Sequence, residues 1–302
     1  MANIFLLCIC FGLGVLFRRS RRFPDNTSQV LNSFILHVSL PALVLQHIHE
    51  IQFSKETLLP ALMPWMIFTA AGILLYVLFL FKKLERKTAI CLLLTAGLGN
   101  TSFVGIPLLE SFLGKGAIGY AIISDQLGTF LVLSFPGLIF ATIADGKEWT
   151  LKSLLKRVFT FAPVFALLMA VLFRPFAYPI WLVVVLQRLG ETLSPLALVS
   201  VGFLLNLRTL KGQKLHLFLG LSLKLIVLPI ITIFVYKNFN IERLMYETII
   251  LESAMAPMVT STIVAIDRNI VPHLASLMLG LGIPLSFITT YFFLNLLKAG
   301  II

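Results

Sequence analysis

Helix-breaking and polar residues gather in one apolar stretch of the chain, between Gly97 and Pro107. Asn100, Thr101 and Ser102 are adjacent within this stretch, and glycines lie on both sides of them. Glycine and proline both destabilise a helix interior, so the stretch is poorly suited to an uninterrupted helix. A broken backbone leaves N–H and C=O groups that can bind a polar solute. The stretch is therefore a candidate binding site.

A second stretch of this kind contains Glu252 and Pro257 among small and hydroxyl residues. If helix resumes at about Pro107 and at about Pro257, each proline occupies a first turn, where its missing N–H does no harm. We expect the two breaks to meet near the bilayer centre. Two helix N-termini would then face inward, and their partial positive charge favours an anionic substrate. The simpler interpretation, that the prolines only kink continuous helices, remains open.

Three ionisable residues lie deep within apolar runs, namely Asp125, Lys224 and Glu252. Each such residue costs about 2.5 to 3.5 kcal/mol at the centre of a membrane helix unless it is paired or solvated. Glu252 is the first candidate for carrying a proton or coordinating sodium beside carbonyls released by a broken helix. Lys224 either joins this charge relay or neutralises one of the acids as a structural pair. For Asp125, with Gln126 beside it, cavity lining and structural pairing are equally open.

The sequence contains no nucleophile elbow, phosphate loop or metalloprotease signature. The three cysteines all lie in apolar stretches, so neither a disulfide framework nor a zinc site of familiar spacing is expected. We therefore expect no catalytic residue, no metal site and no cofactor other than a coupling Na⁺ or H⁺. An intramembrane enzyme is the least favoured class.

The elements that position these residues are expected to be membrane helices. Of the 302 residues, 59% are hydrophobic and only 12% are charged, against about 25% charged in soluble domains. The apolar runs predict an all-α membrane protein with ten transmembrane helices. The expected ranges are 2–17, 26–48, 58–81, 88–109, 117–143, 158–173, 184–207, 215–236, 244–266 and 271–297.

The net charge of +11 resides in short clusters between these runs, which indicates membrane topology rather than a nucleic-acid surface. Sixteen of the 24 Lys and Arg residues fall on the connectors after the odd-numbered helices, and seven fall on the opposite side. Because cytoplasmic loops retain the positive excess, both termini are expected outside the plasma (inner) membrane.

The two halves of the chain resemble each other. Pro41 and Pro195 lie in similar Leu-Ser-Pro-like runs 154 residues apart, and Pro107 and Pro257 are 150 residues apart. The expected plan is a five-helix repeat over residues 1–143, a short cytoplasmic connector over 144–149, and a second repeat over 150–302. Five is odd, so the second repeat enters the membrane inverted, as in many secondary transporters.

The run GNTSFVGIPLL from Gly99 to Leu109, the run LSPLAL from Leu193 to Leu198 and the ten-helix length together resemble the auxin efflux carrier family, in a prokaryotic form. The resemblance implies inverted repeats whose broken helices 4 and 9 cross, with a scaffold domain and a transport domain. It assigns substrate contact to Asn100, Pro107 and Pro257.

The long hydrophilic insert of the plant carriers is missing, and nothing in the sequence requires auxin as the substrate. Bacterial relatives in the family are associated with small carboxylates such as malonate. The stretch around Glu252 is also similar to helix 9 of sodium/bile acid symporters, in which an acid near the crossover binds sodium.

The function expected from these features is secondary transport of a small organic anion by elevator-like alternating access. The substrate-binding candidates are Asn100, Thr101, Ser102, Pro107, Gln126 and Pro257, and the candidates for ion coupling or charge relay are Asp125, Lys224 and Glu252. A membrane receptor or sensor without transport activity, or an anion channel, on the same scaffold remains an alternative. The partners expected are the substrate anion, the lipid bilayer and a second copy of the chain bound through scaffold helices.

Overall fold

The computed structural model describes residues 2–20, 22–50, 58–144, 162–173, 175–204 and 213–302. Within these ranges nearly all regular structure is helical, with one isolated antiparallel bridge. The chain divides into two compact units, residues 1–53 with 149–205 and residues 54–148 with 206–302. Each unit combines a stretch from the first half of the chain with a stretch from the second. The connector expected at 144–149 lies, beyond Ala144, outside the described residues.

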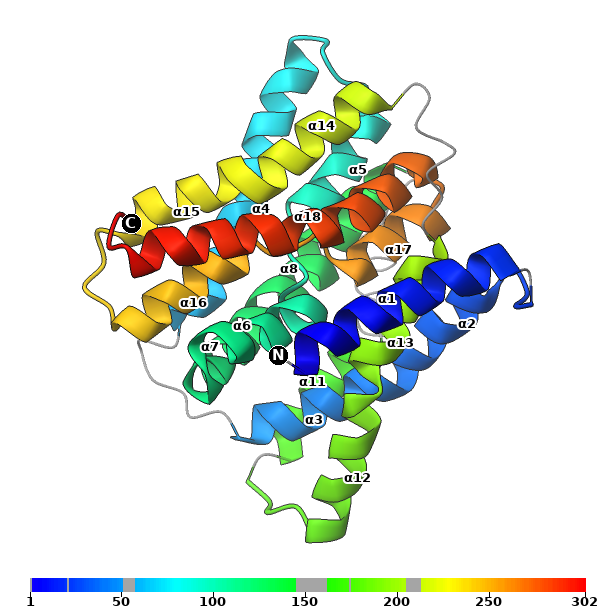
Figure 1. Cartoon of the computed structure of the whole chain (residues 1–302), viewed down its shortest axis with the longest axis vertical. Coiled ribbons are helices and arrows are strands. Elements are labelled where there is room, and N and C mark those ends of the chain that lie inside the picture. Colours follow the sequence, from blue (N-terminus) through cyan, green and yellow to red (C-terminus); the bar gives the residue numbers. More distant parts are fainter. Residues whose placement is uncertain (1, 21, 51–57, 145–161, 174, 205–212) are drawn as a thin grey trace. The chain divides into compact units, whose positions relative to one another are not determined.

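The first unit is built around the packing of its first helix on its last. Its described elements are α1 (Ala2–Ser20), α2 (Thr27–Phe34), η1 (Ile35–Ser39), α3 (Leu40–Glu50), α11 (Ala162–Phe173), α12 (Ile180–Glu191) and α13 (Leu193–Leu204). In Figure 1, α1 lies along α13. Glycines allow this close approach, because a Cβ on Gly14 would lie 2.1 Å from the carbonyl oxygen of Val199, and one on Gly202 would lie 2.2 Å from that of Phe11.

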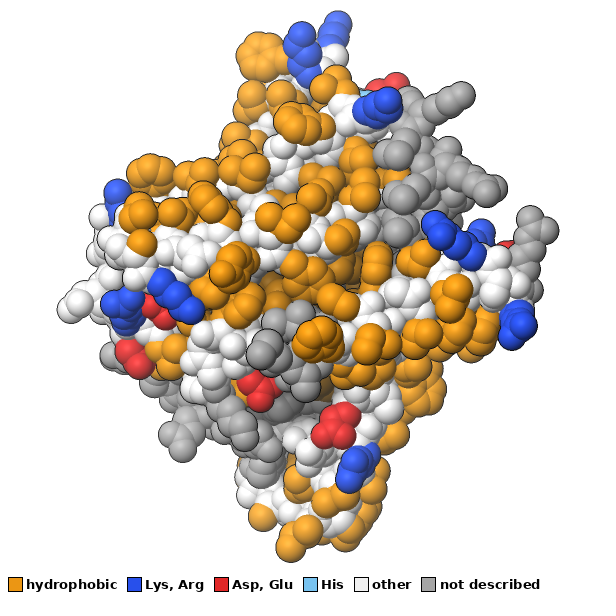
Figure 2. Space-filling model, in the orientation of Figure 1, with side chains coloured by type: hydrophobic (Ala, Val, Ile, Leu, Met, Phe, Trp, Pro, Cys, Tyr) orange, Lys and Arg blue, Asp and Glu red, His pale blue; other side chains and the backbone are white. Residues whose placement is uncertain are grey.

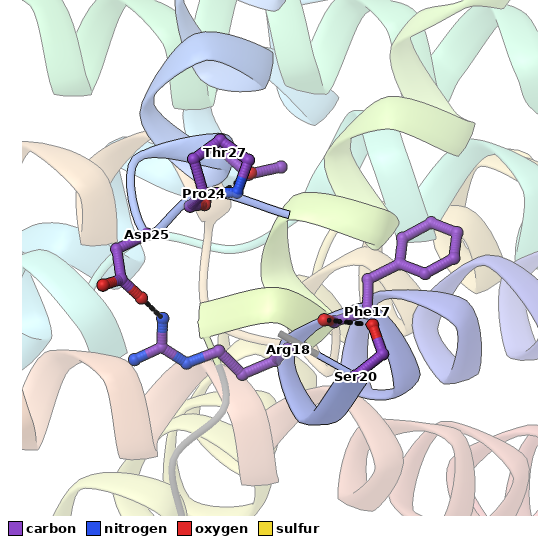
Figure 3. A network of polar contacts seen from close by, with 6 residues as sticks. All are labelled: Phe17, Arg18, Ser20, Pro24, Asp25 and Thr27. Carbon is purple, nitrogen blue, oxygen red and sulfur yellow. Dashed lines mark hydrogen bonds and ion pairs between the residues drawn. The ribbon is translucent and has the colours of Figure 1, made fainter. Parts of the chain in front are cut away.

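An ion pair connects the basic end of α1 with the turn that follows it (Figure 3). The Arg18 guanidinium donates to Asp25 at 2.9 Å and lies over the Phe203 ring, 5.4 Å from its centroid. The Ser20 and Thr27 hydroxyls donate to backbone carbonyls three residues earlier in the chain. These contacts define how α1 leads into α2.

The second unit carries the two stretches that the sequence predicts to be broken. Its described elements are α4 (Leu58–Leu80), α5 (Arg86–Ala96), η2 (Thr101–Gly105), α6 (Ile106–Leu113), η3 (Lys115–Ala117), α7 (Ile118–Ile123), η4 (Ser124–Thr129), α8 (Phe130–Val132), η5 (Leu133–Gly137), α9 (Leu138–Ala144), α14 (Lys214–Ser222), η7 (Leu223–Val227), α15 (Leu228–Tyr236), α16 (Arg243–Ser253), α17 (Val259–Asp267) and α18 (Pro272–Lys298). The long helix α18 packs against α5, α14, α16 and α17 (Figure 1). The segments η2, η4, η5 and η7 are π-helical turns, which in other proteins often accompany functional sites.

Six helical stretches are long and apolar enough to cross a membrane: Thr27–Gln46, Leu58–Leu80, Ile118–Ala144, Ile180–Ser200, Lys214–Tyr236 and Pro272–Lys298. Helix is described in every one of the ten expected ranges. Two of the expected ranges that contain none of these six stretches, 88–109 and 244–266, hold interrupted helices, so neither contains one long uninterrupted helix. Large apolar side chains such as Phe218, Phe234 and Ile288 are exposed, and Figure 2 shows hydrophobic side chains along α14, α15 and α18. This surface suits contact with lipid, and the chain is a multi-pass membrane protein.

Candidate functional site

The helix expected at residues 88–109 is broken, but the break ends earlier than the sequence suggests. α5 ends at Ala96, and helix resumes at Thr101 as the π-helical turn η2, which runs directly into α6. Asn100 caps the new helix, because its side-chain Oδ1 accepts a hydrogen bond from the Phe103 N–H at 3.1 Å.

The α-helix α6 begins at Ile106 with Pro107 in its first turn, as expected, but the π-helical turn η2 precedes it from Thr101, which was not expected. Pro107 lies six residues beyond Thr101 and within the continuing helix. The physical reason for the earlier start is that the Asn100 side chain caps η2, so helical structure begins before the proline is reached.

The second break lies between α16 and α17. α16 ends at Ser253, α17 begins at Val259, and Met258, the N-cap, makes no side-chain capping bond. Pro257 thus lies two residues before the helix, close to the expected position. Gly282 of α18 leaves room for its ring, since a Cβ there would lie 2.4 Å from the Pro257 Cδ.

The two breaks lie side by side and are hydrogen-bonded to each other. Gly99 and Pro257 form the antiparallel bridge, in which the Asn100 N–H donates to the Ala256 carbonyl at 2.7 Å and the Met258 N–H donates to the Leu98 carbonyl at 3.1 Å. These bonds satisfy backbone groups that the breaks release from helical pairing. The pairing also brings the start of η2 and the start of α17 into one region of the second unit.

Glu252 lies at this junction with its carboxylate buried. The residue is 1% exposed, and neither Oε1 nor Oε2 has a hydrogen-bond partner in the described part of the chain. A Cβ on Gly105 would lie 2.7 Å from Oε2 and 2.8 Å from Oε1. Gly105, in the turn that follows the first break, therefore provides the space that Glu252, in the helix that precedes the second break, occupies.

Lys224 approaches the junction from η7 and is 1% exposed. Its Nζ donates to the Ser253 carbonyl at 3.1 Å, a backbone oxygen at the end of α16. A Cβ on Gly99 would lie 3.1 Å from the same Nζ. Across the described residues, no ion pair joins Lys224 directly to Asp125 or Glu252. The lysine thus binds the broken backbone rather than a carboxylate.

Asp125 and Gln126 join the first break through side-chain hydrogen bonds. The Asp125 carboxylate, 3% exposed, accepts from the Thr101 hydroxyl and from the Gln126 Nε2, the latter at 2.8 Å. Ser102 follows Thr101 in η2 and is 8% exposed. The structure therefore brings together the polar residues that the sequence singles out in the expected helices 88–109 and 117–143.

Several buried polar side-chain atoms of the second unit have no partner in the described part of the chain: Asn100 Nδ2, Gln126 Oε1 and both Glu252 oxygens, together with the hydroxyls of Ser124, Thr129 and Ser134. An unsatisfied buried polar group costs roughly 1–3 kcal/mol, so a ligand, ion or water is expected at such atoms. The three hydroxyls were not singled out from the sequence. Their only signal there is that they are polar residues in an apolar run.

Comparison with known proteins shows the family of the chain. Residues 1–294 match the family model described as membrane transport protein. An uncharacterized transporter of Methanothermobacter thermautotrophicus is 23% identical over 255 residues, 83% of each chain. The uncharacterized transporter MJ1031 of Methanocaldococcus jannaschii is 24% identical over 261 residues, 82% of this chain and 83% of the relative. The chain therefore belongs to the family of membrane transport proteins, as its resemblance to the auxin efflux carriers predicts.

Proposed function

We propose that the protein is a secondary transporter that moves a small organic anion across the plasma membrane. The observation that carries the proposal is the Asn100 side chain. It is 1% exposed, its Oδ1 is engaged in the helix cap, and its Nδ2 is a donor with no partner among the described residues, at the place where two broken helices meet. A carboxylate is the acceptor that suits such a donor.

The backbone around Asn100 favours the same ligand. Helices begin at Thr101 and Val259, and the bridge between Gly99 and Pro257 brings both starting points close together. A helix N-terminus carries about half a positive charge and free N–H groups, and it commonly binds anions. Pro257 borders this site.

Thr101 and Gln126 contribute through Asp125, because their side chains donate to that carboxylate, and Ser102 lies next to Thr101. The Gln126 Oε1 has no partner among the described residues, so it is available to the substrate. Pro107 is a weaker candidate because the helix has already begun six residues before it.

Glu252 is the proposed coupling residue, with Asp125 and Lys224 as its charged neighbours. Carboxylate oxygens without partners can take a proton or coordinate Na⁺, and neither oxygen of Glu252 has a partner in the ranges that the structure describes. A proton or Na⁺ bound to Glu252 would offset the negative charge that the substrate anion brings into the site.

Transport would proceed by elevator-like movement of the second unit, which carries both broken helices, against a scaffold formed by the first unit. The proposal includes two inverted repeats, residues 1–143 and 150–302, whose broken helices cross at the Gly99–Pro257 bridge. It also includes both termini outside and a homodimer formed through scaffold helices. The composition of each unit from both halves of the chain supports this plan.

Uptake of radiolabelled small carboxylates into proteoliposomes tests the proposal. Asn100→Ala should weaken apparent substrate affinity at least about tenfold, since a lost hydrogen bond to a charged group is worth about 1.5–3 kcal/mol. Asn238→Ala is the matched control, because Asn238 is exposed and its amide donates only to the Phe234 carbonyl. Unchanged affinity in Asn100→Ala would remove Asn100 from the binding site.

A further inference from the structure

We propose that the second unit binds the phosphate group of an anionic membrane phospholipid in a basic cavity at the N-terminus of α5. The cavity is separate from the two helix breaks, so the inference does not depend on the transported substrate. It rests on the cavity itself, on the start of α5, which has no side-chain cap, and on a buried hydroxyl without a partner.

The cavity lies where two apolar stretches end. It has a volume of about 790 Å³ and is lined by residues from the last turn of α4, the turn between α4 and α5, the first turn of α5 and the start of α14. Leu58–Leu80 and Lys214–Tyr236 are both long and apolar enough to cross a membrane, so we expect the ends that border the cavity at the level of the lipid headgroups. The start of α14 lies beside α5 (Figure 1).

The charge around the cavity is mainly positive. Lys82 and Lys83 line it, and Arg86 and Lys87 follow in the first turn of α5. Among the described residues that line it, Glu85 is the only acid. Figure 2 shows Lys and Arg side chains at this end of α4. Cations at a helix N-terminus are unfavourable, because the helix dipole is positive there, and a bound anion would offset this repulsion.

The start of α5 has backbone donors that nothing caps. The Glu85 side chain makes no capping bond, and the first helical hydrogen bond runs from the Ala89 N–H to the Glu85 carbonyl at 2.9 Å. The N–H groups of Arg86, Lys87 and Thr88 precede it and have no acceptor among the described residues. Free N–H groups and the partial positive charge of a helix N-terminus together form a common binding site for phosphate.

Thr88 supplies an independent observation. It is 6% exposed and lines the cavity, and its hydroxyl has no hydrogen-bond partner in the part of the chain that the structure describes. Thr95 on the same helix is also buried, but its hydroxyl donates to the Cys91 carbonyl at 2.8 Å. Buried polar groups are normally hydrogen-bonded. The Thr88 hydroxyl can therefore donate to an anion that the N–H groups of the same turn also bind.

The apolar part of the cavity favours a phospholipid over a soluble phosphate. Phe79 and Leu80 line it, and both are exposed together with Tyr76 and Phe81, so apolar surface continues along the end of α4. Such a surface suits an acyl chain, and the basic part suits a phosphate. A bound phospholipid would also link the turn after α4 to the start of α14, two segments from different halves of the chain.

Lipid binding to the purified full-length protein tests the proposal. Dissociation constants of phosphatidylglycerol and phosphatidylcholine with identical acyl chains are measured by native mass spectrometry and by thermal shift in detergent. Phosphatidylglycerol should bind at least about tenfold more tightly, because only its headgroup carries a net negative charge. Glycerol 1-phosphate is measured in parallel. It should bind at least about tenfold more weakly than phosphatidylglycerol, because it has no acyl chain to cover the apolar surface.

Charge variants locate the site. Lys82→Gln with Lys83→Gln should reduce the preference for phosphatidylglycerol at least about tenfold. Lys237→Gln with Lys298→Gln is the matched control, since it removes the same charge from exposed positions that do not line the cavity, and it should leave the preference unchanged. All four lysines are exposed, so these variants test the site even if a change at a buried residue prevents folding.

A hydroxyl variant tests the contact in the first turn of α5. Thr88→Val keeps the shape of the side chain and should weaken phosphatidylglycerol binding about tenfold, the order expected for one hydrogen bond to a charged group. Thr95→Val is its control, because the Thr95 hydroxyl already donates to a backbone carbonyl, and it should leave the affinity unchanged. The unfolding midpoint without added lipid shows whether each variant is folded.

Each outcome supports or contradicts the site. Equal affinities for phosphatidylglycerol and phosphatidylcholine would overturn the proposal, and so would equal losses in the cavity variants and their controls. If glycerol 1-phosphate binds as tightly as phosphatidylglycerol, the assignment to a membrane lipid is wrong. Transport of an organic anion at the helix breaks is tested separately and stands or falls by its own measurements.

Discussion

Gly105 and Glu252 are in contact across the two helix breaks, although 147 positions separate them in the sequence. A Cβ on Gly105 would lie 2.7 Å from the Glu252 Oε2, closer than such atoms can approach. The glycine of one broken helix thus determines where the carboxylate of the other can lie.

Gly105→Ala should therefore displace the Glu252 carboxylate. We expect a loss of about 1–3 kcal/mol in stability from overpacking, together with altered dependence of uptake on a proton or sodium gradient. Thermal unfolding in detergent and proteoliposome uptake measure the two effects. Gly119→Ala is the matched control, because a Cβ at this exposed helix position meets nothing within 4 Å. Equal behaviour of the two variants would contradict the contact.

Glu252→Gln should abolish the dependence of uptake on the coupling gradient. The amide keeps the size of the side chain but can neither take up a proton at neutral pH nor offer two anionic oxygens to Na⁺. Uptake rates are compared with an imposed proton gradient, an imposed sodium gradient and neither, with Glu247→Gln as the control. Gradient dependence that persists in Glu252→Gln would assign coupling to another residue.

Asn100 has two separable roles, as helix cap and as substrate donor. Asn100→Ala should lose about 1 kcal/mol of stability together with substrate affinity, because the cap and the amide both disappear. Asn100→Ser should recover most of the stability, since serine caps helices about as well as asparagine, but should not recover the affinity. The unfolding midpoint and the dissociation constant report the two roles. Affinity that returns with the cap would mean that Asn100 acts only through the backbone.

Lys224 should be energetically coupled to Glu252. Lys224→Met removes the hydrogen bond to the Ser253 carbonyl and leaves two buried acids without a buried cation, and the loss of a hydrogen bond from a charged group costs about 1.5–3 kcal/mol. The double variant Lys224→Met with Glu252→Gln should be more stable than Lys224→Met alone. A double-mutant cycle on unfolding free energies measures the coupling. Strictly additive effects would show that the lysine serves only the Ser253 carbonyl.

The packing of α1 on α13 depends on glycine at the point of closest approach. Gly14→Ala should destabilise the first unit, because its Cβ would lie 2.1 Å from the Val199 carbonyl oxygen. A backbone oxygen cannot move aside as the end of a flexible side chain can, so we expect a loss of at least about 1–3 kcal/mol in stability. Gly12→Ala on the same helix meets nothing within 4 Å and should be neutral. A neutral Gly14→Ala would indicate that the two helices do not approach as described.

Much of the local structure could be predicted from the sequence alone. Apolar runs give the helix ranges; the expected range 58–81, for example, corresponds to α4 over Leu58–Leu80, because hydropathy depends on composition over a local window. The two breaks could be located for a similar reason. Glycine, proline and asparagine destabilise helix interiors wherever they occur, and the same residues carry the family resemblance.

Only the tertiary structure decided which groups meet. The π-helical turn η2 precedes α6 because Asn100 supplies a cap at Thr101, and Lys224 binds the Ser253 carbonyl because the second break releases that oxygen close to η7. The contact of Gly105 with Glu252 depends likewise on two distant segments that pack together. Local propensity determines where a helix fails, but the partners of the released polar groups come from remote parts of the chain and are known only once the chain has folded.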